Sequence, residues 1–224
     1  MSRRLALFDL DHTLIPFDSG MAWLRFLAAR GAVAPVLPPY YEECCRQYVR
    51  GSLSLSALHR IAMRPLARHP YEQLIAWQNE FAVEVAPAIP PAAFALVAAH
   101  RAAGALCCVV TTTNEFVATP FARALKVDHL LGTVPRRIGD RFDGQIVGEF
   151  CHAEDKVFRI EAWLHERGEC WESYDDSVAY SDSISDLPLL SGVAKAVAVR
   201  PDRALRAAAW ARGWTIAEDL ADAL

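Results

Sequence analysis

Two aspartates separated by one residue follow a short hydrophobic segment near the start of the chain. Asp9 and Asp11 come directly after residues 4–8, in the run DLDHT at positions 9–13. In an extended segment, side chains two residues apart point to the same side, so both carboxylates face one small volume. Buried like charges repel each other, and a divalent cation with oxygen ligands relieves that repulsion. The pair therefore predicts a site that holds a metal ion.

Three further polar groups are expected at the ends of later strands or one helix away. They are the run TTTN at residues 111–114, Lys156, and the run DSISD at residues 182–186. Open α/β sheets bind ligands at the carboxyl ends of their strands, so the four groups are expected to converge. Asp182 would add an oxygen ligand, and hard oxygen donors with room for water favour Mg²⁺. The seven histidines show no metal-ligand spacing, which argues against zinc.

Carboxylates, a magnesium ion and a lysine can together catalyse phosphoryl transfer. One carboxylate can attack phosphorus to form an aspartyl-phosphate, while a neighbouring carboxyl protonates the leaving oxygen and then activates water. The three equatorial oxygens of the phosphoryl group need donors and cations around them. Thr111 offers a hydroxyl, the helix expected after it offers backbone N–H groups, and Lys156 offers a positive charge.

The elements that must position these residues alternate between strands and helices along most of the chain. Strands are predicted at residues 4–8, 105–110, 129–131, a segment ending at Tyr180, 194–199 and 214–216. Helices are predicted at residues 91–103, 115–125, 154–167 and 202–211. Such alternation indicates a parallel sheet with crossover helices. Residues 141–150 alternate around Asp143-Gly144 and predict a hairpin turn there.

A helical block interrupts this alternation after the first strand. Four segments show helical spacing of apolar residues, and glycines and prolines, Pro65 among them, are expected to separate them: 21–29, 40–49, 55–63 and 71–85. We therefore expect an α/β fold whose core, residues 1–15 and 87–224, has a Rossmann-like parallel sheet with helices on both faces. Residues 16–86 would form an α-helical cap above the strand ends, which is a candidate lid.

Composition excludes several classes of protein. The 224 residues carry a formal net charge of −4, without the cationic surface of a nucleic-acid binder. No apolar stretch approaches the roughly 20 residues that span a bilayer, and the N-terminal apolar run is too short for a signal peptide. We expect a cytoplasmic protein, monomeric or homodimeric, that contacts neither nucleic acid nor membrane. The six cysteines lack CxxC spacing and are interpreted as reduced thiols, mostly in the core.

The same four groups give the sequence a clear likeness to a known superfamily. DLDHTL after a short strand, a Thr ending a second strand, a Lys opening a later helix, and SDSISDLP after a third resemble the four motifs of the haloacid dehalogenase superfamily. The similarity covers essentially the whole chain and is strongest to the phosphoserine-phosphatase-like branch, whose members carry a helical cap after the first strand. The first and fourth motifs are specific, whereas the lysine gains meaning only from its place between them.

The resemblance implies a role for each motif residue. Asp9 would be the nucleophile and a Mg²⁺ ligand, and Asp11 the general acid/base that also gives Mg²⁺ its backbone carbonyl. Asp182 would be a Mg²⁺ ligand, and Asp186 an outer-shell or water-mediated partner of the ion. Thr111 and Lys156 would hold the phosphoryl group. The implied activity is that of a Mg²⁺-dependent phosphomonoesterase acting on a small phosphorylated metabolite.

Departures from the branch leave the substrate open. Phosphoserine phosphatases hold the substrate amine with a cap glutamate and its carboxylate with a cap arginine; Asp18 lies at the first place and Arg60 near the second. His12 replaces the small Ser or Gly usual in the branch, while Thr112 and Asn114 make the second motif bulkier, so all three are candidate substrate contacts. Phosphoserine and histidinol phosphate, which has an amine but no carboxylate, both stay candidate substrates.

Purely structural roles for these aspartates, and other functions for the chain, are alternatives to the phosphatase assignment. Aspartates at strand ends often cap helices, and Asp18 suits the N-cap of a helix that includes Met21. A phosphomutase or phosphotransferase on the same scaffold is one alternative. A non-hydrolytic phosphoacceptor signalling domain is another, against which the spacing of the first two aspartates and the long insertion argue.

Overall fold

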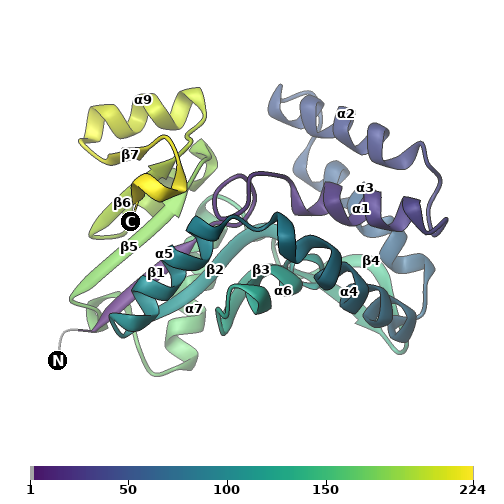
Figure 1. Cartoon of the computed structure of the whole chain (residues 1–224), viewed down its shortest axis with the longest axis horizontal. Coiled ribbons are helices and arrows are strands. Elements are labelled where there is room, and N and C mark those ends of the chain that lie inside the picture. The colour runs from purple at the N-terminus through teal and green to yellow at the C-terminus, as the bar shows by residue number, and fades with distance from the viewer. Residues whose placement is uncertain (1–2, 224) are drawn as a thin grey trace.

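A computed structural model describes residues 3–223 and contains one seven-stranded sheet in the order β4-β3-β2-β1-β5-β6-β7 (Figure 1). The strands are β1 (Arg4–Phe8), β2 (Ala105–Asn114), β3 (His129–Ile138), β4 (Arg141–Val147), β5 (Asp176–Ser181), β6 (Lys195–Val199) and β7 (Thr215–Ala217). All neighbouring strands pair in parallel except β3 and β4, which are antiparallel. The predicted parallel α/β sheet is therefore confirmed, with β1 at its centre.

Helices cover both faces of this sheet because successive strand residues point to opposite sides. Ala6 and Phe8 of β1 face a cluster with α5 (Pro91–Ala102) and α6 (Glu115–Ala124). Leu5 and Leu7 face the other cluster, which contains residues of α7 (Glu154–Glu166), α8 (Leu187–Ser191) and α9 (Arg203–Arg212). Because β1 is buried on both faces, it has a continuous apolar sequence instead of an alternating one.

The segment between β1 and α5 forms four helices: α1 (Ser19–Ala29), α2 (Leu37–Val49), α3 (Leu55–Arg68) and α4 (Tyr71–Val85), followed by a 3₁₀ turn at Ala86–Ala88. Residues of α1, α2 and α3 share a small hydrophobic cluster that contains Met21, Tyr41 and Leu58. By contrast, Trp23 of α1 and Phe81 of α4 pack against Phe116 and Phe121 of α6. The insertion is thus joined to the core through α1 and α4, and α3 packs against β4 of the sheet.

Two turn predictions were wrong. Pro65 was expected to end a helix but lies inside α3, which continues to Arg68, because Met63 and Leu66 are fully buried and packing overrides the lost backbone hydrogen bond. The hairpin turn is at residues 139–140, where Gly139 has φ +60°. Asp143-Gly144 is instead a bulge within β4, where the pairing register with β3 shifts.

The strand that carries the second motif is longer than expected and is closely packed. β2 continues through residues 111–114, so these polar residues are its last residues and do not follow it. Gly132 of β3 lies against this end, where an added Cβ atom would be 2.8 Å from the Thr113 carbonyl oxygen. Only glycine allows the two strands to approach this closely at the end of β2.

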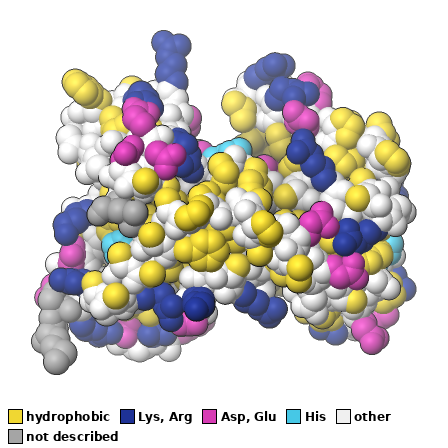
Figure 2. Space-filling view, in the orientation of Figure 1, with side chains coloured by type: hydrophobic (Ala, Val, Ile, Leu, Met, Phe, Trp, Pro, Cys, Tyr) yellow, Lys and Arg dark blue, Asp and Glu magenta, His cyan; other side chains and the backbone are white. Residues whose placement is uncertain are grey.

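The six cysteines are all free thiols, and four of them are buried: Cys44, Cys107, Cys108 and Cys151. Within residues 3–223, no single helix is both long and apolar enough to cross a membrane. One bent pair, residues 71–88 and 91–102 meeting at 98°, passes such a test of length and composition when taken together. Hydrophobic side chains gather over the middle of one face, with charged side chains around them (Figure 2).

Candidate active site

The predicted polar groups meet at the carboxyl ends of three neighbouring strands. Phe8 of β1 pairs in register with Val109 of β2 and with Tyr180 of β5. Continued by one residue, this register places Asp9 beside the residue that precedes Thr111 on one flanking strand and beside the residue that precedes Asp182 on the other. The Asp9 backbone N–H donates to the Tyr180 carbonyl oxygen at 2.9 Å, which continues the pairing one residue beyond β1.

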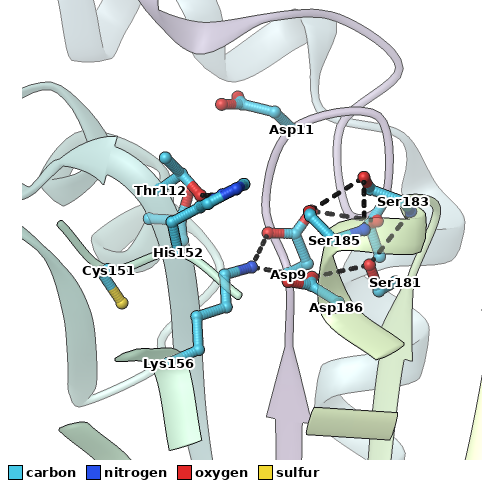
Figure 3. A network of polar contacts seen from close by, with 12 residues as sticks. Asp9, Asp11, Thr112, Cys151, His152, Lys156, Ser181, Ser183, Ser185 and Asp186 are labelled. Atoms are coloured by element: carbon cyan, nitrogen blue, oxygen red, sulfur yellow. Dashed lines mark hydrogen bonds and ion pairs between the residues drawn. The ribbon is translucent and has the colours of Figure 1, made fainter. Parts of the chain in front are cut away.

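A buried lysine joins two of the carboxylates (Figure 3). Lys156, in the first turn of α7, donates from Nζ to Asp9 Oδ1 at 2.8 Å and to Asp186 Oδ2 at 2.7 Å. The Lys156 side chain is only 2% exposed, and those of Asp9 and Asp186 are 10% and 1% exposed. Burial alone would lower the pKa of Lys156, but the charges of Asp186 and Asp9 raise it, so the ammonium stays protonated.

Two hydroxyls supply further side-chain donors to the carboxylates. Thr13 Oγ1 lies 3.2 Å from Asp9 Oδ2 and 3.0 Å from Asp182 Oδ1. Ser181 Oγ donates to Asp186 Oδ2 at 2.7 Å, while the buried Asp186 Oδ1 has no hydrogen-bond partner within residues 3–223. Because one hydroxyl carries one proton, Thr13 cannot fully satisfy both acids. The site therefore has more acceptor oxygens than donors.

Burial raises the pKa values of Asp9 and Asp182. The pKa of Asp9 is raised to about 7 mainly by burial, with Asp186 and Asp11 adding to the effect and Lys156 opposing it. Burial and the charge of Asp9 raise the pKa of Asp182 to about 7. One lysine thus leaves the negative charge of three converging carboxylates only partly compensated, which favours a bound cation.

Asp11 lies apart from this group (Figure 3). Its carboxylate accepts hydrogen bonds from the Ser19 backbone N–H at 2.8 Å and from Thr113 Oγ1 at 2.6 Å. Burial and the nearby charge of Asp18 raise the pKa of Asp11 to about 6, against the effect of those hydrogen bonds. The side chain is thereby held between the end of β2 and the start of α1, above the Asp9 carboxylate.

The donor set fits a magnesium ion. The surplus of carboxylate oxygens, and Asp186 Oδ1, which has no partner among the described residues, are hard donors of the kind that Mg²⁺ binds. Within residues 3–223, no three His, Cys, Asp or Glu side chains are grouped so that they could hold a metal by themselves.

The threonine side chains at the end of β2 contact different neighbours. Thr111 is buried, and its Oγ1 accepts from the Thr113 backbone N–H at 3.2 Å. Thr112 Oγ1 lies 3.4 Å from His152 Nδ1, while Thr113 reaches Asp11. His12 is exposed at φ +59°, a left-handed conformation that few residues other than glycine adopt, and Arg200 donates to its carbonyl oxygen at 2.9 Å.

Three other predicted contacts have different surroundings. Asn114 is the N-cap of α6, with its side chain accepting from the Val117 backbone N–H at 3.0 Å. Asp18 is the N-cap of α1 and accepts from Met21 N at 2.6 Å, while it also lies close enough to raise the pKa of Asp11. Arg60 is exposed on α3. Asn114 and Asp18 therefore stabilise the first turns of α6 and α1 beside the site. Arg60 has no described partner in the site.

Several polar residues of this site were given no role by the sequence analysis. Thr13 lies between Asp9 and Asp182, Ser181 donates to Asp186, Ser19 and Thr113 orient Asp11, and His152 contacts Thr112. Thr13 lies in the first motif itself, so spacing alone could have identified it. His152 gives no such signal, because its partners are distant in sequence. A surface cavity of about 720 Å³ is located elsewhere, near Arg4 and Asp176 at the starts of β1 and β5.

Known proteins share this fold and sequence. The histidinol-phosphatase of Neisseria meningitidis serogroup C is 38% identical over 96% of this chain and 98% of its own length. A protein of unknown function from Bordetella pertussis Tohama I is 40% identical, with a TM-score of 0.92, and the match covers 98% of this chain and 100% of that one. A substrate-bound phosphoserine phosphatase shares the fold, with a TM-score of 0.69 at 16% identity and coverage of 98% and 96%.

The family assignment agrees with the arrangement of the strand-end residues. Residues 6–191 match the family of haloacid dehalogenase-like hydrolases, a range that includes all four motifs and the helical insertion. Together with the relative that is 38% identical along nearly its whole length, this match shows that the chain belongs to the haloacid dehalogenase-like hydrolase family.

Proposed function

We propose that the protein is a Mg²⁺-dependent phosphomonoesterase that hydrolyses a small phosphate ester through an aspartyl-phosphate on Asp9. The carrying observation is the buried Asp9 carboxylate, held by Lys156 Nζ at 2.8 Å beside two further acids at the central strand end. The sequences named as phosphatases among its relatives support the same class of reaction.

The residues divide the reaction between them. Asp9 would attack phosphorus through the oxygen that is not directed at Lys156, while the lysine keeps the nucleophile in place and offers positive charge to the phosphoryl oxygens. Asp11, with a pKa of about 6, is suited to protonate the leaving oxygen and then to deprotonate water. The Thr111 hydroxyl and the backbone N–H groups that begin α6 would hold the remaining oxygens.

Asp9, Asp182 and the Asp11 backbone carbonyl would bind Mg²⁺, with Asp186 acting in part through water. When bound, the ion supplies positive charge that neutralises the acids and the phosphoryl oxygens. Asp186 Oδ1, buried and unpartnered in the described chain, is the oxygen best placed to accept from water around the ion.

We further propose that residues 16–86 act as a cap and that the substrate is an amino phosphate ester of the histidinol phosphate type. Asp18 and Asp11 make the cap side of the site acidic, which suits a substrate amine. Arg60, the candidate partner for a substrate carboxylate, is exposed on α3 and has no described partner in the site, which favours a substrate without a carboxylate. The full-length similarity to a histidinol-phosphatase supports this choice.

Phosphate release across a substrate panel tests the proposal. The panel contains an aryl phosphate, histidinol phosphate, phosphoserine, sugar phosphates and nucleotides, each assayed with Mg²⁺ and with a chelator. We expect Mg²⁺-dependent release, with histidinol phosphate the best natural ester. Transfer of phosphate to a sugar without net release would instead indicate a mutase. No release by the folded, Mg²⁺-loaded protein from any compound would overturn the phosphatase assignment.

The stabilising effect of Mg²⁺ is expected to grow with pH. Asp9 and Asp182 have pKa values of about 7 in the fold against an ordinary value of 3.8, so between these values the folded protein binds more protons than the unfolded chain. The unfolding free energy of the metal-free protein therefore falls as pH rises through this window. Ionised acids bind Mg²⁺ better, so the ion should raise the melting temperature more at pH 8 than at pH 5.

Thermal unfolding with Mg²⁺ or chelator at a series of pH values measures this effect. The Asp182→Asn variant is the matched control, since it removes one of the two titrating ligands and should weaken both trends. An equal Mg²⁺-induced rise in melting temperature at pH 5 and pH 8 would contradict the proposed ligands.

A further inference from the structure

His152 connects a helix of the insertion to the end of strand β2. Its Nε2 atom lies 3.2 Å from Tyr48 Oη on α2, and its Nδ1 atom lies 3.4 Å from Thr112 Oγ1. The rings of Tyr48 and His152 also meet edge to face, with centroids 6.3 Å apart. One imidazole therefore makes a polar bridge between the insertion and the strand that carries Thr111.

The bridge stands beside the reacting groups. In Figure 3, His152 and Thr112 lie across the Lys156 ammonium from Asp186, on the side that the Asp9 carboxylate faces. The Asp155 backbone N–H donates to the His152 carbonyl oxygen at 3.0 Å, so the backbone of His152 is joined to the start of α7. An ester bound between Asp9 and Asp11 would have its leaving group next to this ring.

The segment around His152 is held in place from several sides. Phe150 packs against the buried His59 of α3, with ring centroids 5.1 Å apart. Cys151 is fully buried, and its backbone N–H donates to Thr133 Oγ1 at 3.1 Å. Ala153 has φ +50°, a strained conformation that persists only where surrounding contacts fix it. Residues 150–153 therefore contact α2 and α3 from a fixed position on the core.

The chemistry of the bridge suits a neutral imidazole. Burial and the charge of Lys156 lower the pKa of His152, so the ring carries one donor and one acceptor nitrogen. Each hydroxyl partner can donate or accept, so Tyr48 and Thr112 satisfy either tautomer. At 3.2 and 3.4 Å, both contacts are at the long end of hydrogen bonding and can shorten if α2 moves toward β2.

We propose that His152 is a specificity-determining residue that encloses the leaving group by holding the Tyr48 end of α2 over the strand ends. This inference rests on the proposed phosphatase function. The phosphoryl group is positioned by Asp9, Lys156 and Thr111, so the bridge acts on the part of the substrate that lies under the cap. Contacts to that part contribute to catalysis only for esters that use them.

Steady-state kinetics of the full-length, Mg²⁺-loaded enzyme on two substrates test this role. With histidinol phosphate, Tyr48→Phe and His152→Ala should each lower kcat/KM about tenfold, the effect of losing one hydrogen bond. The Tyr48→Phe variant should hydrolyse an aryl phosphate at nearly the wild-type rate, because a good leaving group needs little enclosure. His152→Gln, which can still reach Tyr48, should recover much of the lost activity.

The matched control is Tyr40→Phe, because Tyr40 lies on the same helix and is 54% exposed. It should leave both activities unchanged. The double variant Tyr48→Phe/His152→Ala should be no worse than His152→Ala, since both changes break the same bridge. An unchanged Tyr48→Phe enzyme, equal losses on both substrates, or additive losses would each overturn the inference alone. A wild-type protein inactive on both substrates would overturn the proposed function, and this inference with it.

Discussion

Replacing Asp9 by Asn is expected to lower phosphate release by a factor on the order of 10³ or more while the protein keeps its fold. An amide cannot replace the carboxylate as a nucleophile toward phosphorus. It matches the carboxylate in size, however, and its carbonyl oxygen can still accept the hydrogen bond that Lys156 Nζ donates at 2.8 Å. Because the pKa of Asp9 is raised to about 7, loss of its charge at pH 8 should leave the melting temperature equal or higher.

The measurement pairs phosphate release with thermal unfolding at pH 8. Asp128→Asn is the control for an aspartate change as such, because Asp128 is exposed between α6 and β3, and it should behave as the wild type does. Substantial turnover by Asp9→Asn would assign the nucleophile to another group. Loss of activity together with a lower melting temperature would indicate a structural role for Asp9.

Replacing Lys156 by Met is expected to abolish activity and also to reduce the unfolding free energy by about 3–5 kcal/mol. Methionine fills a similar volume but leaves Asp9 and Asp186, which Lys156 contacts at 2.8 and 2.7 Å, without their cation. Both acids are buried, so water cannot replace the lost charge. Urea unfolding and phosphate release on the same preparation measure the two effects.

Two further variants separate charge from packing at this position. Lys195→Met removes a lysine that is 66% exposed and paired with Asp176, and it should change stability little. In the double variant Asp9→Asn/Lys156→Met, only one buried carboxylate remains ionised beside the methionine, so part of the stability should return while activity stays absent. A Lys156→Met protein as stable as the wild type would show that the lysine does not hold the two acids together.

Sequence reasoning predicted the regular elements well where the signal is local. The apolar run of β1 and the helical spacing of α4 and α7 gave their positions within about a residue, because periodicity depends on near neighbours in the chain. The same reasoning failed at Pro65 and at Asp143-Gly144. Both have strong local preferences, and contacts from elsewhere overrode them: burial of α3 in one case and the pairing of β4 with β3 in the other.

The same distinction between local signals and long-range contacts applies to the candidate site. The identity and order of Asp9, Asp11, Lys156 and Asp182 were visible in the sequence, and parallel pairing was enough to predict that they meet at one edge of the sheet. The individual partners were not visible. The carboxylate of Asp11 faces Ser19 and Thr113 and turns away from the group around Lys156, because the start of α1 and the end of β2 supply the donors there.

The sequence by itself therefore determined the strand and helix order, the family likeness and the set of acidic and basic groups, since these follow from residue types and short spacings. Tertiary structure decided which carboxylates share Lys156, which oxygen of Asp186 has no partner within residues 3–223, and that Tyr48 meets His152 across 104 residues of chain. The physical reason is that such contacts depend on how whole layers pack, and no local pattern in the chain encodes the distance between two layers.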